Sequence, residues 1–434
     1  MNAAIRPIVL FGLVGCLIVG TGFVQSWNSA LLILNMGLVS AIMSLGVNLQ
    51  WGLAGLFNVG VMGFVALGGL AAVLVSMPPV PEAWSAGGAR VMLGIGVGAS
   101  VVAAAVVAWQ RLKGKLLRGL TVLVILVGGF FVFRAVLDPG VSAIEAIDPA
   151  TTGYLGGLGL PIVLAWPVGG LMAAGAAWII GKTALGLRSD YLAIATLGIA
   201  EIIIALLKNE DWLSRGVKNV IGLPRPLPNE IDLQGDPAFV ERAAGFGLDA
   251  TTASTLYVKL GYGLMFSAVL IVFLVLAQLA LNSPWGRMMR AIRDNEVSAR
   301  AMGKDVKARH LQVFILGSAI CGFAGAMMTT LDGLLTPGTY QPLRYTFLIW
   351  VMVIVGGSGN NLGAVLGGIL IWFMWVQVEP IGQGIMTLAT SGMADGNWLK
   401  EHLLDSVQHM RLLTMGVILL LVLRFAPRGL LPER

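Results

Sequence analysis

The sequence predicts an all-α membrane protein that crosses the bilayer many times. The chain has 434 residues, of which 57% are hydrophobic and only 12% are charged, whereas a soluble domain is about half apolar and about a quarter charged. Its 58 glycines suit closely packed transmembrane helices, in which small residues let backbones approach. A soluble core could not bury this much apolar surface, so residues 1–434 are expected to form a single transmembrane domain.

Apolar runs bounded by turn residues and charges predict about twelve spans, since a transmembrane helix needs about 20 mostly apolar residues. The predicted spans lie near residues 8–24, 30–48, 54–76, 91–108, 117–134, 160–180, 190–207, 257–281, 310–331, 344–358, 362–378 and 411–425. An even number of spans puts both termini on the same side of the membrane.

Basic residues in short loops set the orientation, because cytoplasmic loops carry an excess of Lys and Arg. They gather at residues 111–118 and 287–309 and at the two chain ends. These loops and both termini are therefore predicted to be cytoplasmic, and the net charge of +6 needs no nucleic-acid partner. Two longer polar stretches, residues 208–256 and 379–410, are then an external loop and an external segment.

No motif predicts catalysis or metal binding. His310, His402 and His409 form no HExxH spacing. Cys16 and Cys321 lie far apart in apolar runs, which predicts neither a disulfide nor a metal site. No GxxxxGK[ST] loop occurs, so nucleotide phosphates cannot be held in that way. We therefore expect no catalytic residue, no metal and no cofactor bound by this chain.

Residues 283–309, SPWGRMMRAIRDNEVSARAMGKDVKAR, predict an amphipathic helix between two spans. Ser283 is a good N-cap, Pro284 is a natural first helical residue, and Gly303 can end the helix in the left-handed conformation. We expect one helix of about five turns over residues 284–302. Its charges have both signs, which argues against a helix that only lies on lipid. Bracing its own bundle or docking on another protein both stay open.

This segment resembles the cytoplasmic EAA-type coupling loop of permeases of ATP-binding-cassette (ABC) importers, and it is close to the M subunit of branched-chain amino-acid importers. The positions that carry the likeness are Glu296, Ala299, Ala301 and Gly303. The same family is resembled by GLFNVGVMGFVALGG at 55–69, SDYLAIATLGIAEIII at 189–204, GGSGNNLGAVLGG at 356–368 and RFAPRGLL at 424–431. The likeness spans most of residues 30–431.

The resemblance implies a permease subunit that moves branched-chain aliphatic amino acids across the bacterial inner membrane. Urea or short amides are an alternative cargo, because the permeases of those systems look alike. The implied partners are two ABC ATPase subunits that bind ATP and magnesium, a homologous second permease, a periplasmic solute-binding protein and membrane lipid. The residues implied in contact with the ATPase are Arg290, Arg293, Asp294, Glu296, Ala299 and Gly303.

The sequence departs from the family in three places. Residues 77–150 hold an extra helical pair, and residues 379–410 form a longer external segment than a minimal permease needs. Leu316 is followed by Gly317, where the usual pattern has proline. These departures leave the coupling prediction intact, but no role is predicted for the added segments.

Candidates for the solute path come from unusual residues within the spans. Glu201 is the one acidic residue placed inside a span, where a carboxylate is costly and usually faces protein or water; a structural role near the external end of its helix is an equal alternative. Helices can break at six further positions and expose backbone to a cavity, with close helix packing as the alternative. They are Asn58, Gly60, Gly356, Gly357, Gly359 and Asn360.

A secondary transporter or channel that needs no ATPase is the rival class. Such a protein usually carries several intramembrane ionisable groups for ion coupling. Only Glu201 qualifies, so the importer is favoured.

Overall fold

The computed structural model describes residues 5–148, 152–187, 189–393 and 397–433. Within these ranges ten helices are long and apolar enough to cross a membrane, and two shorter apolar helices, Val61–Ser76 and Arg344–Gly356, accompany them. The one sheet in the described chain pairs two residues of β1 with two of β2. The prediction of an all-α polytopic membrane fold is confirmed, and every predicted span overlaps one of these helices.

Long helices alternate with short helical turns along the chain. In chain order the elements are α1 (Ile5–Val24), α2 (Trp27–Asn48), η1 (Leu49–Leu53), α3 (Val61–Ser76), α4 (Pro81–Ala83), η2 (Trp84–Gly88), α5 (Ala89–Arg111), α6 (Lys115–Glu145), η3 (Ile162–Leu164), α7 (Ala165–Ala184), α8 (Ser189–Asn209), α9 (Asp211–Ser214), η4 (Gly216–Lys218), β1 (Val220–Ile221), α10 (Glu230–Gln234), α11 (Pro237–Gly245), α12 (Ala250–Asn282), α13 (Pro284–Asp294), α14 (Glu296–Ala301), α15 (Val306–Asp332), β2 (Leu334–Leu335), η5 (Pro337–Thr339), η6 (Leu343–Phe347), α16 (Leu348–Gly356), α17 (Asn361–Ala389), α18 (Trp398–Asp405), η7 (Ser406–His409) and α19 (Met410–Phe425).

The core of the bundle forms around α2 and α15. Helix α15 packs against α7, α3 and α2, while α17 packs against α2 and α16. Small residues allow this close packing: a side chain at Gly68 of α3 would collide with the carbonyl of Gly322 on α15. The abundant glycines therefore serve helix contacts here, as the composition suggested.

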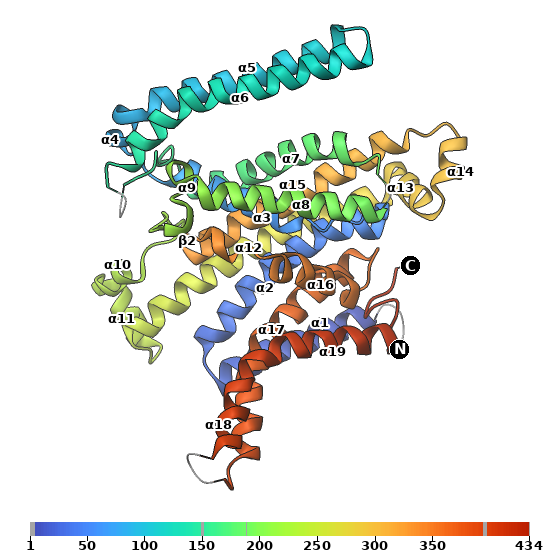
Figure 1. The fold of residues 1–434 in the computed structure, drawn as a ribbon. Coiled ribbons are helices and arrows are strands. Elements are labelled where there is room, and N and C mark those ends of the chain that lie inside the picture. Colours follow the sequence, from blue (N-terminus) through green and yellow to red (C-terminus); the bar gives the residue numbers. More distant parts are fainter. Residues whose placement is uncertain (1–4, 149–151, 188, 394–396, 434) are drawn as a thin grey trace.

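The additional helical pair of residues 77–150 is a long hairpin, α5–α6. Its two helices pack mainly against each other, and most of their apolar side chains are exposed. Figure 1 shows the hairpin running along one side of the bundle. A hairpin with so much exposed apolar surface requires the bilayer as its surroundings.

Several helix boundaries differ from the predicted spans. The predicted span 54–76 is helical only from Val61 onward, because residues 55–60 form an irregular segment. Helix α6 extends to Glu145, and α17 extends to Ala389 through Pro380, so both pass the predicted ends of their spans. A proline inside a helix costs one hydrogen bond, which neighbouring helices can tolerate.

The two ends of the bundle differ in what they carry. Figure 1 shows the start of α1, the end of α19, the α5–α6 turn and the pair α13–α14 at one end. Helices α10, α11 and α18 lie at the other. The predicted coupling segment therefore shares an end with the start of α1 and the end of α19.

Candidate functional site

Residues 284–301 form two helices, α13 and α14, so the expected single helix over 284–302 is wrong. Helix α13 ends at Asp294, and Asn295 adopts an extended backbone with φ −154° and ψ 93°. The Asn295 side chain accepts a hydrogen bond from the backbone N–H of Ser298 at 2.9 Å. Asparagine competes with the helical backbone in this way, so Asn295 ends α13 and caps α14.

Both outer ends of the pair match the sequence prediction. The Ser283 hydroxyl accepts from the backbone N–H of Gly286 at 3.3 Å, and Pro284 is the first helical residue. Gly303 has φ +75°, and the backbone N–H of Lys304 donates to the Ala299 carbonyl at 3.2 Å. This is the Schellman arrangement, which needs a left-handed residue at the position of Gly303.

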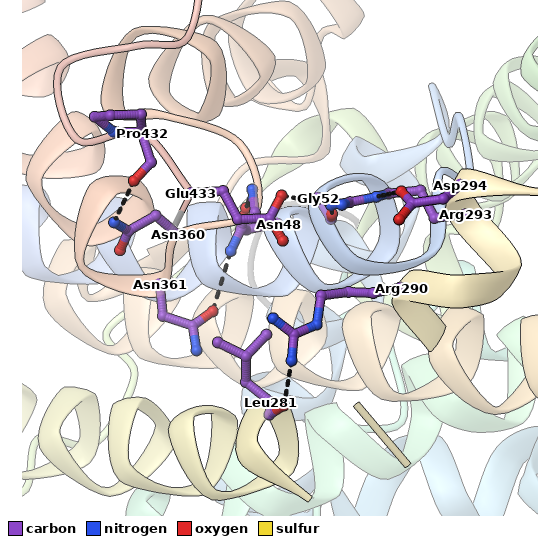
Figure 2. Close-up of polar contacts among 11 residues, drawn as sticks. Asn48, Gly52, Leu281, Arg290, Arg293, Asp294, Asn360, Asn361, Pro432 and Glu433 are labelled. Atoms are coloured by element: carbon purple, nitrogen blue, oxygen red, sulfur yellow. Dashed lines mark hydrogen bonds and ion pairs between the residues drawn. The ribbon is translucent and has the colours of Figure 1, made fainter. Parts of the chain in front are cut away.

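Arg293 anchors α13 to the bundle (Figure 2). Its Nη1 donates to the Gly52 carbonyl at the end of α2–η1 and, at 2.8 Å, to the Glu433 carboxylate, while its Nε lies 3.2 Å from Asp294. Burial alone would lower the pKa of Arg293, but Glu433 and Asp294 outweigh it and raise that pKa. The guanidinium therefore stays charged while it joins the coupling segment, α2 and the C-terminal tail.

The C-terminal tail, residues 426–433, lies on the turn between α16 and α17. The backbone N–H groups of Leu430 and Leu431 donate to the carbonyls of Val355 and Gly356, each at 2.8 Å. The Asn360 side chain donates to the Pro432 carbonyl at 3.1 Å. The tail is thus fastened to this turn along several consecutive residues.

The glycines of this turn permit that contact. Gly357 has φ +119°, and a side chain there would collide with the Leu431 carbonyl. Gly359 has φ +84°, and its N–H donates to the Asn48 side chain at 2.8 Å. The structure therefore brings together Arg293, the tail and the candidate path residues Gly356, Gly357, Gly359 and Asn360. These residues let the backbone of the turn lie close to the backbone of the tail.

Sequence reasoning missed a row of side-chain amides beneath this turn. Asn48 of α2 donates to the Asn361 side chain at 3.1 Å (Figure 2). Asn361 donates in turn to Gln278 of α12 at 3.4 Å. Asn48 and Asn361 are buried. A buried amide in an apolar helix needs such partners, so Asn48 at the end of an apolar run was a readable signal. These bonds tie α2, α12 and α17 together at the coupling end.

The remaining predicted coupling residues divide between inner and outer faces. Arg290 is half-buried, and its guanidinium donates to the Leu281 carbonyl at 3.5 Å. Asp294 is exposed, and Glu296 is exposed in an ion pair with Arg300 one turn later. Val297 and Met302 are 78% and 79% exposed. Helix α14 therefore presents a free surface of mixed apolar and charged side chains, while Arg290 and Arg293 contact the chain itself.

The irregular segment 55–60 is stabilised by side chains. Asn58 is buried; its Oδ1 accepts from the Gly60 N–H and its Nδ2 donates to Gln50, both at 2.9 Å. The Asn58 carbonyl accepts from the Trp350 indole at 3.0 Å. A side chain at Gly60 would collide with the Thr196 carbonyl of α8. Side chains thus pair several backbone groups of the break that follows η1, which is how a break within a membrane bundle is tolerated.

An apolar groove of about 640 Å³ lies beside this break. Its residues come from the irregular segment, α8, residues 341–347 and α16. They are Phe57, Val59, Leu197, Gln341, Pro342, Thr346, Phe347, Trp350 and Ile354. The rings of Phe57 and Trp350 lie 4.6 Å apart. Mostly apolar walls with a few polar groups are typical of sites for small molecules.

Glu201 lies on the outside of this chain. Its side chain is exposed on α8, next to Ile202, which is 66% exposed, and one turn beyond the groove residue Leu197. Asn58 and Gly60 are buried in segment 55–60 behind the groove residues Phe57 and Val59. Gly356, Gly357, Gly359 and Asn360 lie at the coupling end. The structure thus separates the candidate path residues into three places.

Comparison with known proteins places the chain among permeases. A family model described as the permease component of the branched-chain amino acid transport system matches residues 116–423. The high-affinity branched-chain amino acid transport system permease protein LivM of Escherichia coli (strain K12) is 26% identical over 297 residues, which are 68% of this chain and 62% of LivM. The matched region thus spans less than two thirds of that relative. No solved structure matches the chain significantly.

Two archaeal relatives from Methanocaldococcus jannaschii are also similar. Its probable branched-chain amino acid transport permease protein LivM is 30% identical over 154 residues, 36% of this chain and 41% of the relative. Its probable permease protein LivH is 31% identical over 112 residues, 25% of this chain and 35% of the relative.

Proposed function

Because the chain belongs to the permease family of the branched-chain amino acid transport system, we propose that it is the membrane subunit of an ATP-driven importer for branched-chain aliphatic amino acids. It is a multi-pass inner-membrane protein. In the proposal the ten long apolar helices and the two shorter ones all cross the bilayer, which gives twelve spans. Both termini and the pair α13–α14 then lie in the cytoplasm.

The observation that carries this proposal is that α13 is bound to the rest of the chain whereas α14 is exposed. Arg293 joins α13 to Gly52 and Glu433, while α14 projects a surface with no partner in the described chain. A movement imposed on α14 from outside would therefore be passed to α2 and to the α16–α17 turn. We assign Asp294, Glu296, Ala299 and Gly303 to the ATPase contact, and Arg290 and Arg293 to anchoring.

The proposed partners are the other subunits that such an importer needs. Two ABC ATPase subunits would bind ATP and magnesium and dock on α14, and this chain itself would hydrolyse no ATP and hold no cofactor. A homologous second permease would cover the face of α8 on which Glu201 is exposed. A periplasmic solute-binding protein would meet the opposite end, where α10, α11 and α18 lie.

The groove beside segment 55–60 is the proposed part of the solute path in this chain. Its apolar side chains suit the aliphatic side chain of leucine, isoleucine or valine, which gains free energy when it leaves water. Urea has no such group and would gain little from Phe57, Leu197 or Trp350. The groove therefore favours aliphatic amino acids over urea or short amides.

Uptake in vesicles tests the proposal. Vesicles that carry this chain with its genomic neighbours are supplied with ATP and labelled leucine, isoleucine or urea, and wild type is compared with Glu296→Arg. The matched control is Glu82→Arg, the same change on an exposed residue of α4, which is assigned to no partner. We expect leucine and isoleucine uptake that Glu296→Arg abolishes and Glu82→Arg leaves intact. Uptake without any ATPase subunit would instead identify a secondary transporter, and uptake of urea alone would exclude the proposed cargo.

A further inference from the structure

A second groove lies between α7, α12 and α15, and no part of the described chain fills it. It encloses about 650 Å³. Leu171 of α7, Leu276 of α12 and Leu316 of α15 line it and are 70%, 55% and 49% exposed. Ala174 of α7 and Ala319 of α15 also line it, and because their side chains are small, the space between these helices stays wide. This groove is separate from the one beside segment 55–60.

The groove is closed partway along the bundle. The rings of Phe273 on α12 and Phe323 on α15 meet edge to face with centroids 5.0 Å apart, and Trp166 packs against Phe323. From Ile315 to Phe323 the groove follows α15 for about 12 Å. A transmembrane helix of a partner protein would be about 10 Å wide and would continue across the bilayer. The Phe273–Phe323 contact would block such a helix from lying along the groove. A single hydrocarbon chain fits a groove that ends in this way.

Trp285 of α13 lines one end of the groove, and two arginines outside the lining lie near Trp285. The Trp285 indole donates to the Gln312 side chain at 3.3 Å, and the Arg309 guanidinium donates to the same oxygen at 3.0 Å. Arg287 lies two residues after Trp285 and donates to the Asn282 carbonyl at 3.1 Å. Neither arginine forms an ion pair with a carboxylate in the described ranges. A tryptophan beside uncompensated guanidinium groups suits the level of lipid headgroups and their phosphates.

We propose that this groove binds one anionic phospholipid, with an acyl chain between α7, α12 and α15 and its phosphate between Arg287 and Arg309. The apolar walls recognise the chain, and the two guanidinium groups recognise the anionic headgroup. Because Trp285 belongs to α13, the bound lipid also supports the base of the coupling segment. The lipid site itself does not depend on the cargo or on the ATPase.

Native mass spectrometry of the purified full chain tests the site. The protein is equilibrated with equal amounts of phosphatidylglycerol and phosphatidylcholine with identical acyl chains, and the lipid retained after detergent exchange is counted. We expect one retained phosphatidylglycerol per wild-type chain. Ala319→Phe, which fills the groove, should lose it, and Ala174→Phe repeats the test from the opposite wall. The double variant Arg287→Gln/Arg309→Gln should lower the preference for phosphatidylglycerol about tenfold or more.

Two control variants match these changes away from the groove. Ala104→Phe adds the same ring on the exposed face of α5, and Arg118→Gln removes a cation beside the α5–α6 turn; both should keep the lipid. Equal retention by wild type and by both groove-filling variants would overturn the proposal, as would equal retention of the two lipids by wild type. Cross-linking of a cysteine placed by Leu171→Cys to the second permease would also overturn it, because a protein would then cover the groove.

Discussion

Arg293 and Glu433 lie 140 positions apart in the sequence, yet their side chains meet at 2.8 Å. The same guanidinium also bonds the Gly52 carbonyl. One side chain thus links three parts of the chain: the coupling segment, the end of the helix that leads into the irregular segment 55–60, and the tail on the α16–α17 turn. Since Trp350 and Ile354 of α16 line the proposed solute groove, this link connects α14 to both sides of that groove.

Glu433→Gln should weaken transport more than it weakens folding. Both side chains are about one quarter exposed, and removing one partner of such a charged hydrogen bond costs on the order of 1–3 kcal/mol. The tail keeps its backbone bonds to Val355 and Gly356, so the protein should still insert. We expect several-fold less leucine transported for each ATP hydrolysed.

Asp294→Asn provides the comparison for Glu433→Gln. Asp294 also contacts Arg293, but its side chain is 68% exposed, and exposed ion pairs contribute about 0–1 kcal/mol. Its effect on coupling through Arg293 should therefore be small. Because Asp294 is also assigned to the ATPase contact, ATPase binding is measured for both variants. If both bind the ATPase as wild type does and lose the same fraction of coupled transport, Glu433 has no special positioning role.

Asn295→Ala should disturb the orientation of α14. The substitution removes the cap that ends α13 and starts α14, at a cost of about 1 kcal/mol, and alanine favours one continuous helix. A continuous helix would turn Val297 and Met302 to a new direction. We expect weaker binding of the ATPase subunit, measured by surface plasmon resonance on nanodiscs that hold the permease.

Asn295→Asp and Asn295→Ser keep a capping oxygen and should retain ATPase binding. Equal binding by the alanine, aspartate and serine variants would show that the break at Asn295 has no part in docking. The thermal stability of the bundle should be the same for all three, because Asn295 is exposed at the surface.

The coupling segment shows what local patterns predict and what they miss. Ser283 and Gly303 were predictable because a cap and a left-handed glycine depend on neighbouring backbone alone. The break at Asn295 was missed because asparagine is tolerated inside helices as well as at caps. The inward position of Arg293 could have been inferred from the apolar residue Met289, four positions earlier. The two residues share one helical face, and Met289 is fully buried.

The partners of these residues depend on long-range packing. Nothing local to Glu433 indicates that it meets Arg293, and nothing local to the glycine-rich turn indicates that it receives the tail. The helical elements followed from hydropathy because the bilayer imposes length and apolarity on each span. Helix-to-helix register has no comparable local rule, so the path residues Gly356, Gly357, Gly359 and Asn360 could not be told from packing residues by sequence.

Leu197→Trp should block the solute path while ATP hydrolysis continues. Leu197 is half-buried at the wall of the groove beside segment 55–60, and an indole there would fill space that the aliphatic cargo needs. The control is Ile271→Trp on the exposed face of α12, which should transport normally. Initial rates of labelled leucine uptake and of ATP hydrolysis are measured on the same vesicles. Normal uptake by Leu197→Trp would remove this groove from the path.

Glu201→Leu should show whether Glu201 on α8 contacts a partner protein or lipid. An ionised carboxylate that faces hydrocarbon is costly, so an exposed Glu201 in a span implies a polar partner outside this chain. If the second permease supplies that partner, the leucine variant loses it, and the yield of the second permease that co-purifies with this chain should fall several-fold. Glu201→Gln, which can still hydrogen-bond, should lose less.

Ile202→Leu is the control for this comparison, because Ile202 is the exposed neighbour of Glu201 and keeps its apolar character. It should co-purify with the second permease as wild type does. The opposite result for Glu201→Leu is equally informative: unchanged co-purification with higher thermal stability would mean that Glu201 faces lipid or headgroups. The second permease would then have to bind a face of the bundle other than α8.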